Sequence, residues 1–108
     1  MSLLAQREAE RREARLRLFE SSRLRLRTAL RELAPGREFL LFGSLIQPGR
    51  FNAESDVDLG FTELPPGKSE YLLAAELEER LGRPIDLIDL NRSRLRDKIL
   101  REGERWIA

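Results

Sequence analysis

The pattern of hydrophobic and polar positions first predicts a long helix at the N-terminus. Residues 3–33 contain neither glycine nor proline, and Pro35-Gly36 then ends the run. In the second half, apolar residues recur at helical spacing, which predicts one buried face that Arg23 interrupts. The first half is mostly Arg, Glu and Ala, so we expect it to project from the core. The apolar face consists of Leu16, Phe19, Leu26, Leu30 and Leu33.

Two short strands are predicted after this helix. The apolar run at residues 38–42 ends at Gly43 and favours a buried strand. Residues 45–54 contain proline, glycine and asparagine, which favour a loop. Residues 56–62 then alternate between polar and apolar side chains, as a second strand does.

A second helix, a third strand and a last helix follow. Ser69 is a suitable cap for a helix that ends near Leu81, because Gly82 comes next. Residues 84–90 predict the third strand, and Asn91 is expected to cap a helix that continues to about residue 101. The buried face of the second helix is predicted from Leu72, Leu73, Leu77 and Leu81, and a short terminal strand from Arg105-Trp106-Ile107.

This order of elements predicts an α+β fold. Two strands joined by a loop and a third reached through a helix favour an α/β sandwich, with a small mixed sheet of three or four strands flanked by helices. With 108 residues, of which 41% are hydrophobic, the chain can bury one core. We therefore expect a single domain over 1–108, with the N-terminal helix in 1–34 and the core that carries the site in 38–108.

Composition excludes several classes of chemistry. The chain has no cysteine and no histidine, so a bound metal must be a hard cation held by oxygen, such as Mg²⁺. The net charge is +1, and the nine arginines of residues 1–34 are interspersed with five glutamates, so we expect no nucleic-acid binding. No apolar run approaches the roughly 18 residues of a membrane span, which predicts a cytoplasmic protein without membrane contact.

Two aspartates in the second predicted strand are candidate metal ligands. Asp56 and Asp58 are two positions apart, so a strand places both carboxylates on one face and Val57 on the other. Adjacent carboxylates repel each other unless a cation lies between them. An exposed polar face would give the same pattern, so the spacing alone leaves both interpretations open.

Two further features favour the metal interpretation. Gly43-Ser44 ends an apolar strand, where glycine allows close backbone approach and backbone amides can hold an anion such as phosphate. A third acid is available in the third predicted strand, at Asp86 or at Asp89, which face opposite ways on a regular strand. We favour Asp86, because Asp89 lies at the strand end, where a carboxylate can serve a helix start.

Taken together, these residues resemble a known family. Phe42-Gly43-Ser44, the later Ser55-Asp56-Val57-Asp58-Leu59 and the acid-bearing third strand are similar to the minimal nucleotidyltransferases (MNT) of the DNA polymerase β-like superfamily. The resemblance runs from about residue 39 to residue 107. It implies a nucleotidyltransferase fold, ATP as substrate and Mg²⁺ as cofactor.

The resemblance also implies roles for individual residues. Gly43 and Ser44 would bind the nucleotide phosphates, with Ser55 as a further nucleotide-binding residue. The metal ligands and catalytic residues would be Asp56, Asp58 and Asp86. Many relatives carry a basic residue directly after the Gly-Ser pair, where this chain has Leu45. Arg50 either takes over that phosphate contact or is a solvated loop residue.

Members of this family typically pair with small helical HEPN proteins in toxin–antitoxin modules. The resemblance therefore implies an antitoxin that transfers AMP from ATP to a tyrosine hydroxyl of a HEPN toxin. One alternative is a binding module that neutralises a partner without catalysis, and another is a small-molecule nucleotidyltransferase of the aminoglycoside-modifying type. The long N-terminal helix is also a candidate surface for a homodimer or for the partner.

Overall fold

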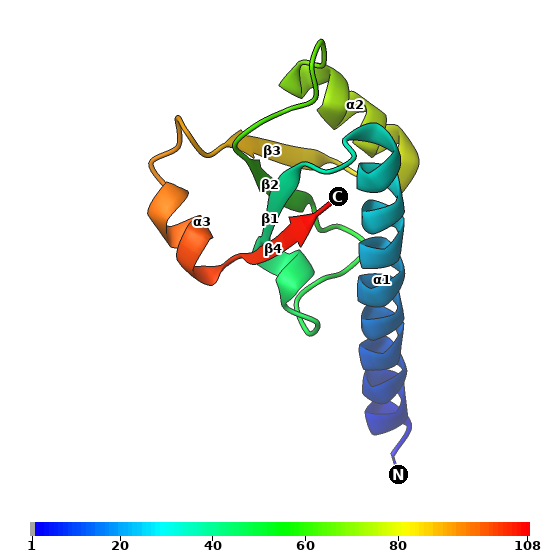
Figure 1. Cartoon of the computed structure of the whole chain (residues 1–108). Coiled ribbons are helices and arrows are strands. Elements are labelled where there is room, and N and C mark those ends of the chain that lie inside the picture. The colour runs from blue at the N-terminus through cyan, green and yellow to red at the C-terminus, as the bar shows by residue number, and fades with distance from the viewer. Residues whose placement is uncertain (1) are drawn as a thin grey trace.

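Eight elements follow one another along residues 2–108, the part of the chain that the computed structural model describes (Figure 1). The helices are α1, α2 and α3, with a short 3₁₀ helix, η1, and the strands are β1 to β4. In chain order their bounds are α1 Leu3–Leu33, β1 Glu38–Phe42, η1 Gly43–Ile46, β2 Val57–Phe61, α2 Glu70–Leu81, β3 Ile85–Asp89, α3 Arg96–Glu102 and β4 Glu104–Ile107.

The four strands form one mixed sheet in the order β3-β2-β1-β4. β1 pairs antiparallel with both β2 and β4, whereas β2 and β3 are parallel and are joined through α2. A parallel pair needs such a crossover, because the chain must return to the end of the sheet at which the first strand began. The α+β prediction with a small mixed sheet is thus confirmed.

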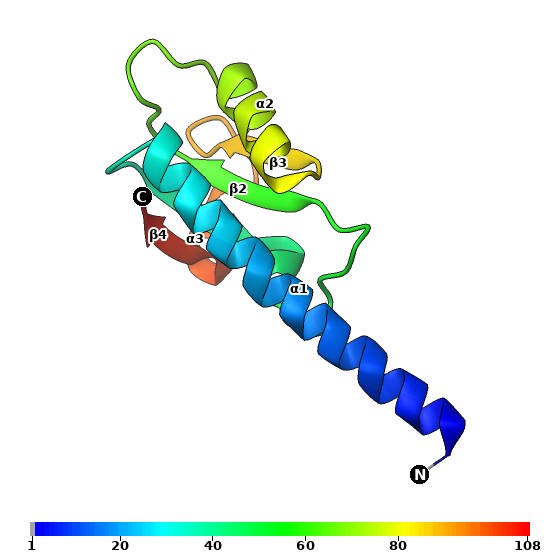
Figure 2. The same ribbon diagram turned by 90° about the vertical axis from the view of Figure 1, so that its right-hand side faces the viewer.

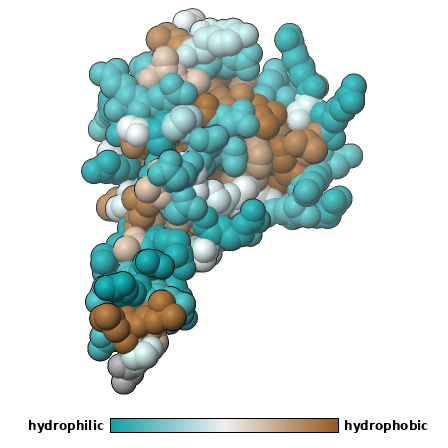
Figure 3. Space-filling view, turned by 180° about the vertical axis from the view of Figure 1, so that it is seen from behind, coloured by the Kyte–Doolittle hydropathy of each residue, from teal (hydrophilic) through white to brown (hydrophobic). Residues whose placement is uncertain are grey.

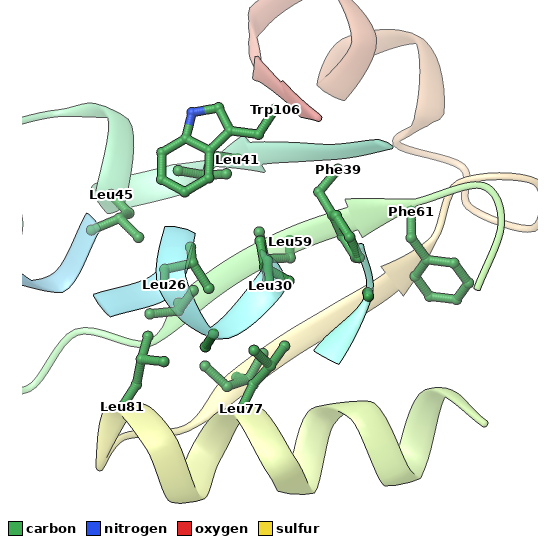
Figure 4. Packing of buried hydrophobic residues seen from close by; sticks show 14 of the residues in the cluster. Leu26, Leu30, Phe39, Leu41, Leu45, Leu59, Phe61, Leu77, Leu81 and Trp106 are labelled. Atoms are coloured by element: carbon green, nitrogen blue, oxygen red, sulfur yellow. The ribbon is translucent and has the colours of Figure 1, made fainter. Parts of the chain in front are cut away.

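Alternation along the strands divides the molecule into three layers. One face of the sheet packs on α1 and α2 and forms the main core (Figure 4). The opposite face carries a smaller cluster of Leu40, Leu90 and Ile99 beneath α3. The sheet therefore lies between α3 on one side and α1 with α2 on the other (Figure 1). Strand residues in the main core are Phe39, Leu41, Val57, Leu59, Phe61, Ile85 and Trp106.

The first half of α1 projects beyond the sheet, as the sequence predicts (Figure 2). This projection makes the molecule 55 Å long but only 28 Å and 19 Å across. The buried side chains of α1 lie between Phe19 and Leu30 on one face of the helix. Leu16 is 44% exposed and does not belong to this face, contrary to the prediction. An apolar patch marks the projecting end (Figure 3), where Leu3 and Leu4 are exposed.

Caps at three helix ends match or correct the predictions. The Ser69 hydroxyl accepts a hydrogen bond from the Leu72 amide at 3.1 Å, and Gly82 ends α2 with a left-handed φ of 68°. The prediction that Asn91 caps the last helix is wrong. Its side chain instead donates to the Thr62 carbonyl at 2.9 Å, and α3 begins only at Arg96.

Two smaller expectations also need correction. Leu72 is 48% exposed and lies outside the buried face of α2, which consists of Leu73, Leu77 and Leu81. The first two residues of the predicted loop at 45–54 belong to a 3₁₀ helix, η1, which covers Gly43–Ile46 directly after β1. Among the helices of residues 2–108, none combines the length and apolar content that crossing a bilayer demands.

Candidate functional site

The carboxylates of Asp58 and Asp86 belong to neighbouring parallel strands at the same register. Asp58 of β2 is the Cα partner of Asp86 of β3. Paired residues of adjacent strands lie about 4.8 Å apart and share a face of the sheet. Val57 and Leu59 on either side of Asp58 are fully buried against α1 and α2, so Asp58 faces the side of α3. Asp56 precedes β2 by one residue and is exposed.

The three acids interact electrostatically. Burial, and then the negative charges of Asp86 and Asp56, raise the pKa of Asp58 from 3.8 to about 6. Desolvation and like charge both disfavour the ionised form, so the ionised Asp58 carboxylate is destabilised in the folded chain. A cation among the acids would relieve both effects.

The donor chemistry of the site fits a hard divalent cation. Three carboxylates supply oxygen ligands, and the sequence offers no histidine or cysteine that would prefer a softer metal. Within residues 2–108, however, no three acidic side chains are gathered into a ready-made metal-ligand group. Coordination by all three aspartates therefore stays a prediction that their shared face supports.

The alternative third acid, Asp89, occupies a different environment. It is the Cα partner of Phe61, a residue of the main core, and so lies on the opposite face from Asp58. Its Oδ1 accepts a hydrogen bond from the Asn91 amide at 2.9 Å, which stabilises the turn after β3. Asp86, not Asp89, is the acid that the sheet aligns with Asp58.

Gly43 brings the backbone against the Asp58 carboxylate. Its φ is +71°, a left-handed conformation that L side chains rarely adopt. A Cβ at this position would lie 2.2 Å from Asp58 Oδ2. Glycine is therefore required here both for the turn after β1 and for the close approach to the acid.

The residues that follow Gly43 in η1 face different surroundings. Ser44 is half-buried, whereas Leu45 is fully buried in the main core. The Leu45 carbonyl accepts a hydrogen bond of 2.9 Å from Arg23 of α1. Where many relatives carry a basic residue after the Gly-Ser pair, this chain therefore has a side chain of the main core, Leu45.

A cavity of about 370 Å³ opens beside Gly43 and Asp58. Its walls combine the end of β1, η1 and the following loop, β2 and α3. Its polar residues are Gln47, Arg50, Asp58, Lys98 and Glu102, and its apolar residues are Phe42, Ile46, Leu95 and Ile99, with Gly43 between them. Such a concave surface with a few polar groups is typical of a small-molecule site.

The predicted phosphate-binding residues lie in different relations to this cavity. Arg50 lines it, and its Nη1 donates to Gln47 Oε1 at 3.2 Å. Gln47 Nε2 in turn donates to the Gly43 carbonyl at 3.0 Å, which links Arg50 to the glycine turn. Ser55 is not among the lining residues, and its hydroxyl accepts a hydrogen bond from the Asn52 amide at 3.0 Å.

The sequence pattern did not single out four polar residues of this region. Gln47, Lys98 and Glu102 line the cavity, and Arg83 donates to the carbonyls of Asn52 and Ser55 at 3.1 and 2.8 Å, which orders the loop before Asp56. Lys98 is one of only two lysines, which was a signal available in the sequence. No local pattern signalled Gln47 or Arg83, because their partners come from the folded loop.

Comparison with known proteins gives two findings. The family model described as "Polymerase beta, Nucleotidyltransferase" matches residues 27–107. A solved structure described as "Crystal structure of the toxin-antitoxin with AMP-PNP" contains a chain with 26% sequence identity and a TM-score of 0.60. The alignment covers 78% of this chain and 72% of that chain. A search of curated proteins finds no significant match.

The family match spans the sheet, the Gly43 turn and all three acids, together with residues 27–33 at the end of α1. The resemblance to minimal nucleotidyltransferases, which rested on short motifs, is thereby confirmed over most of the chain. The chain belongs to the polymerase β nucleotidyltransferase family.

Proposed function

We propose that the chain is a Mg²⁺-dependent nucleotidyltransferase that transfers AMP from ATP to a tyrosine hydroxyl of a HEPN-type toxin and so acts as an antitoxin. One observation carries the proposal: Asp58, which lines the cavity beside Gly43, is the register partner of Asp86. Family membership supports nucleotidyl transfer. The similar toxin–antitoxin structure with AMP-PNP supports the nucleotide and the partner class.

In this proposal the acceptor oxygen attacks the α-phosphorus of ATP. A bond forms between that oxygen and phosphorus, the bond to the β-phosphate bridging oxygen breaks, and pyrophosphate leaves. Asp86, at the exposed edge strand β3, accepts the hydroxyl proton. Asp56, Asp58 and Asp86 would hold Mg²⁺, which neutralises phosphate charge and lowers the pKa of the attacking hydroxyl.

Position-specific labels distinguish this reaction from other uses of ATP. The chain is incubated with Mg²⁺, the product of the adjacent gene and ATP labelled on either the α- or the γ-phosphate. We expect label on the partner from α-labelled ATP only, and none from an analogue whose α–β bridging oxygen is a methylene. Asp58→Asn should abolish transfer, whereas Asp97→Asn on α3 should retain it. Transfer of γ-label, or undiminished transfer by Asp58→Asn, would refute the proposal.

A second candidate is a module that neutralises its partner by binding alone. The projecting half of α1 favours it, because a helix with exposed side chains on most sides is free to contact another protein (Figure 2). Removing residues 2–14 should then abolish neutralisation, while Asp56→Ala with Asp58→Ala leaves it intact. The opposite pattern, in which only the acid substitutions matter, supports the enzyme.

A further inference from the structure

The cavity beside Asp58 is lined by charges of both signs. Asp58 of β2 and Glu102 of α3 supply negative charge, and Asp86 and Asp56 lie near Asp58 outside the cavity wall. Two cations, Arg50 from the loop after η1 and Lys98 from α3, line the same cavity. A ligand that fits both parts carries a cation toward the acids and negative charge toward Arg50 and Lys98. A metal–polyphosphate has this distribution.

The described part of the fold gives neither cation an acidic partner. Among residues 2–108, no acidic side chain lies within ion-pair distance of Lys98 or Arg50. The other lysine shows the contrast. Lys68 Nζ donates to the Leu33 carbonyl at 3.1 Å and pairs with Glu76 at 3.0 Å, so it ties the α2 region to the end of α1. Lys98 has an exposed side chain instead, on a helix of only seven residues.

The two cations come from segments far apart in the chain. Arg50 donates to Gln47, whose side chain donates to the Gly43 carbonyl, so the guanidinium is connected to the glycine turn. Lys98 directly precedes Ile99, whose side chain is 3% exposed in the small core with Leu40 and Leu90. The packing of Ile99 therefore fixes the backbone that carries Lys98. A pair of cations carried by an ordered backbone is suited to hold a flexible chain of phosphates.

We propose that Lys98 of α3 is a phosphate-binding residue, which together with Arg50 holds the terminal phosphates of a nucleoside triphosphate and makes the site prefer triphosphates to monophosphates. The proposal deepens the proposed function and rests on it. It assigns the leaving pyrophosphate to the basic side of the cavity, whereas the α-phosphate lies toward Asp58.

Glu102 provides the competing explanation. Glu102 lies one helical turn after Lys98 and lines the same cavity. If Lys98 binds no ligand, its role is only to offset the negative charge of Glu102. In that role Lys98 contacts no phosphate, and its loss weakens ATP binding only by leaving Glu102 uncompensated. Glu102→Gln would then fully restore ATP binding to Lys98→Ala, whereas a lost phosphate contact would not be restored.

Nucleotide binding by the intact chain tests the proposal. Calorimetry with ATP and with AMP, each with Mg²⁺, is carried out on the wild type, Lys98→Ala, Lys98→Ala with Glu102→Gln, Lys98→Arg and Arg101→Ala. Arg101→Ala is the matched control, because it removes one positive charge from the same helix but does not line the cavity. Thermal unfolding of each variant verifies that it is folded.

We expect Lys98→Ala to weaken ATP binding by about tenfold or more, because it removes a charge-assisted contact. AMP binding should change by less than about twofold, Lys98→Arg should retain most of the affinity, and Arg101→Ala should equal the wild type. Equal losses for ATP and AMP, full restoration of ATP binding by Glu102→Gln, or unchanged ATP binding by Lys98→Ala, overturn the role of Lys98 alone. A folded wild type that binds no ATP overturns the proposed function and this inference with it.

Discussion

Gly43 lies so close to Asp58 that a side chain on Gly43 would displace the Asp58 carboxylate. A Cβ on Gly43 would lie 2.2 Å from Asp58 Oδ2, and Gly43 has a left-handed φ of +71°. Phe42, the residue before this glycine, is the Cα partner of Asp58 in the antiparallel pair of β1 and β2. The register of two strands therefore brings the glycine turn and the acid together.

Replacing Gly43 by alanine should damage both stability and activity. We expect a loss of about 1–3 kcal/mol, because alanine is strained at positive φ and its methyl group overlaps the Asp58 carboxylate. Transfer of AMP should fall at least about tenfold, since Asp58 must move. Urea denaturation and the label-transfer assay measure the two effects. Gly49→Ala is the control, because nothing lies within 4 Å of its added Cβ. Wild-type activity in Gly43→Ala would contradict the close contact.

The raised pKa of Asp58, about 6 instead of 3.8, should make stability depend on pH. The folded chain binds this proton more tightly than the unfolded chain, so the free energy of unfolding falls as pH rises from about 4 to about 6. The full shift corresponds to about 3 kcal/mol, which solvent screening of a half-buried group reduces to about 1–2 kcal/mol. Asp58→Asn should therefore be more stable than the wild type at neutral pH and should lose this part of the pH dependence.

Urea denaturation of the wild type and Asp58→Asn at about pH 5 and pH 7.5 measures the difference. Glu20→Gln, on the exposed face of α1, is the control for removal of a carboxylate elsewhere. Mg²⁺ should stabilise the wild type at neutral pH but not Asp58→Asn, because only an ionised Asp58 contributes to cation binding. A wild type and Asp58→Asn with parallel pH profiles would argue against the buried, repelled carboxylate.

Asp86 and Asp89 can be distinguished by matched substitutions. Asp86→Asn should abolish Mg²⁺-dependent AMP transfer, with a loss of at least about a hundredfold, because it removes the acid aligned with Asp58. Asp89→Asn should stay active, since an amide oxygen can still accept the hydrogen bond from the Asn91 amide. Transfer rates and thermal unfolding of both variants check this. An inactive but folded Asp89→Asn would assign the third acid to the other face.

The sequence was sufficient to predict the elements whose patterns are local. Binary patterning located β1, β2 and β3, because each buries alternate side chains or a short apolar run. Ser69 and Gly82 bounded α2 through interactions within a few residues of the chain. The period of two in a strand predicted that Asp86 and Asp89 face opposite ways, and the position of Asp89 at the strand end favoured Asp86, which the register pairs with Asp58.

Predictions that depended on distant partners were wrong or absent. Asn91 has the composition of a helix cap, but its side chain bonds to Thr62, 29 positions away, and the helix begins later. Lys98 lines the cavity because Ile99, the next residue of α3, packs on the sheet. A helix of seven residues is too short for its apolar periodicity to indicate this packing. Arg23 interrupts the apolar face of α1. No residue near it in the sequence accounts for a charge at this position, whereas its distant partners in the folded chain do.

Arg23 joins α1 to the site and to the last strand. It donates to the Leu45 carbonyl at 2.9 Å and to Glu104, and its guanidinium lies 5.1 and 5.2 Å from the ring centres of Phe19 and Trp106. Burial would raise the pKa of Glu104, but hydrogen bonds from Arg23 and Trp106 hold it below its ordinary value. The charge in the apolar face is thus paired and hydrogen-bonded.

Arg23→Met should therefore destabilise the chain by about 1–3 kcal/mol, although methionine suits an apolar helix face. The substitution leaves the Leu45 carbonyl without its donor and Glu104 without its cation, and unpaired groups of this kind carry a desolvation penalty. Because Leu45 belongs to η1, the position of Gly43 should also loosen, and the affinity for ATP should decrease. Urea denaturation and calorimetry measure both effects, with Arg25→Met on the exposed face of α1 as the control. If Arg23→Met were as stable as the control, Arg23 would be a tolerated charge and not the link between α1 and the glycine turn.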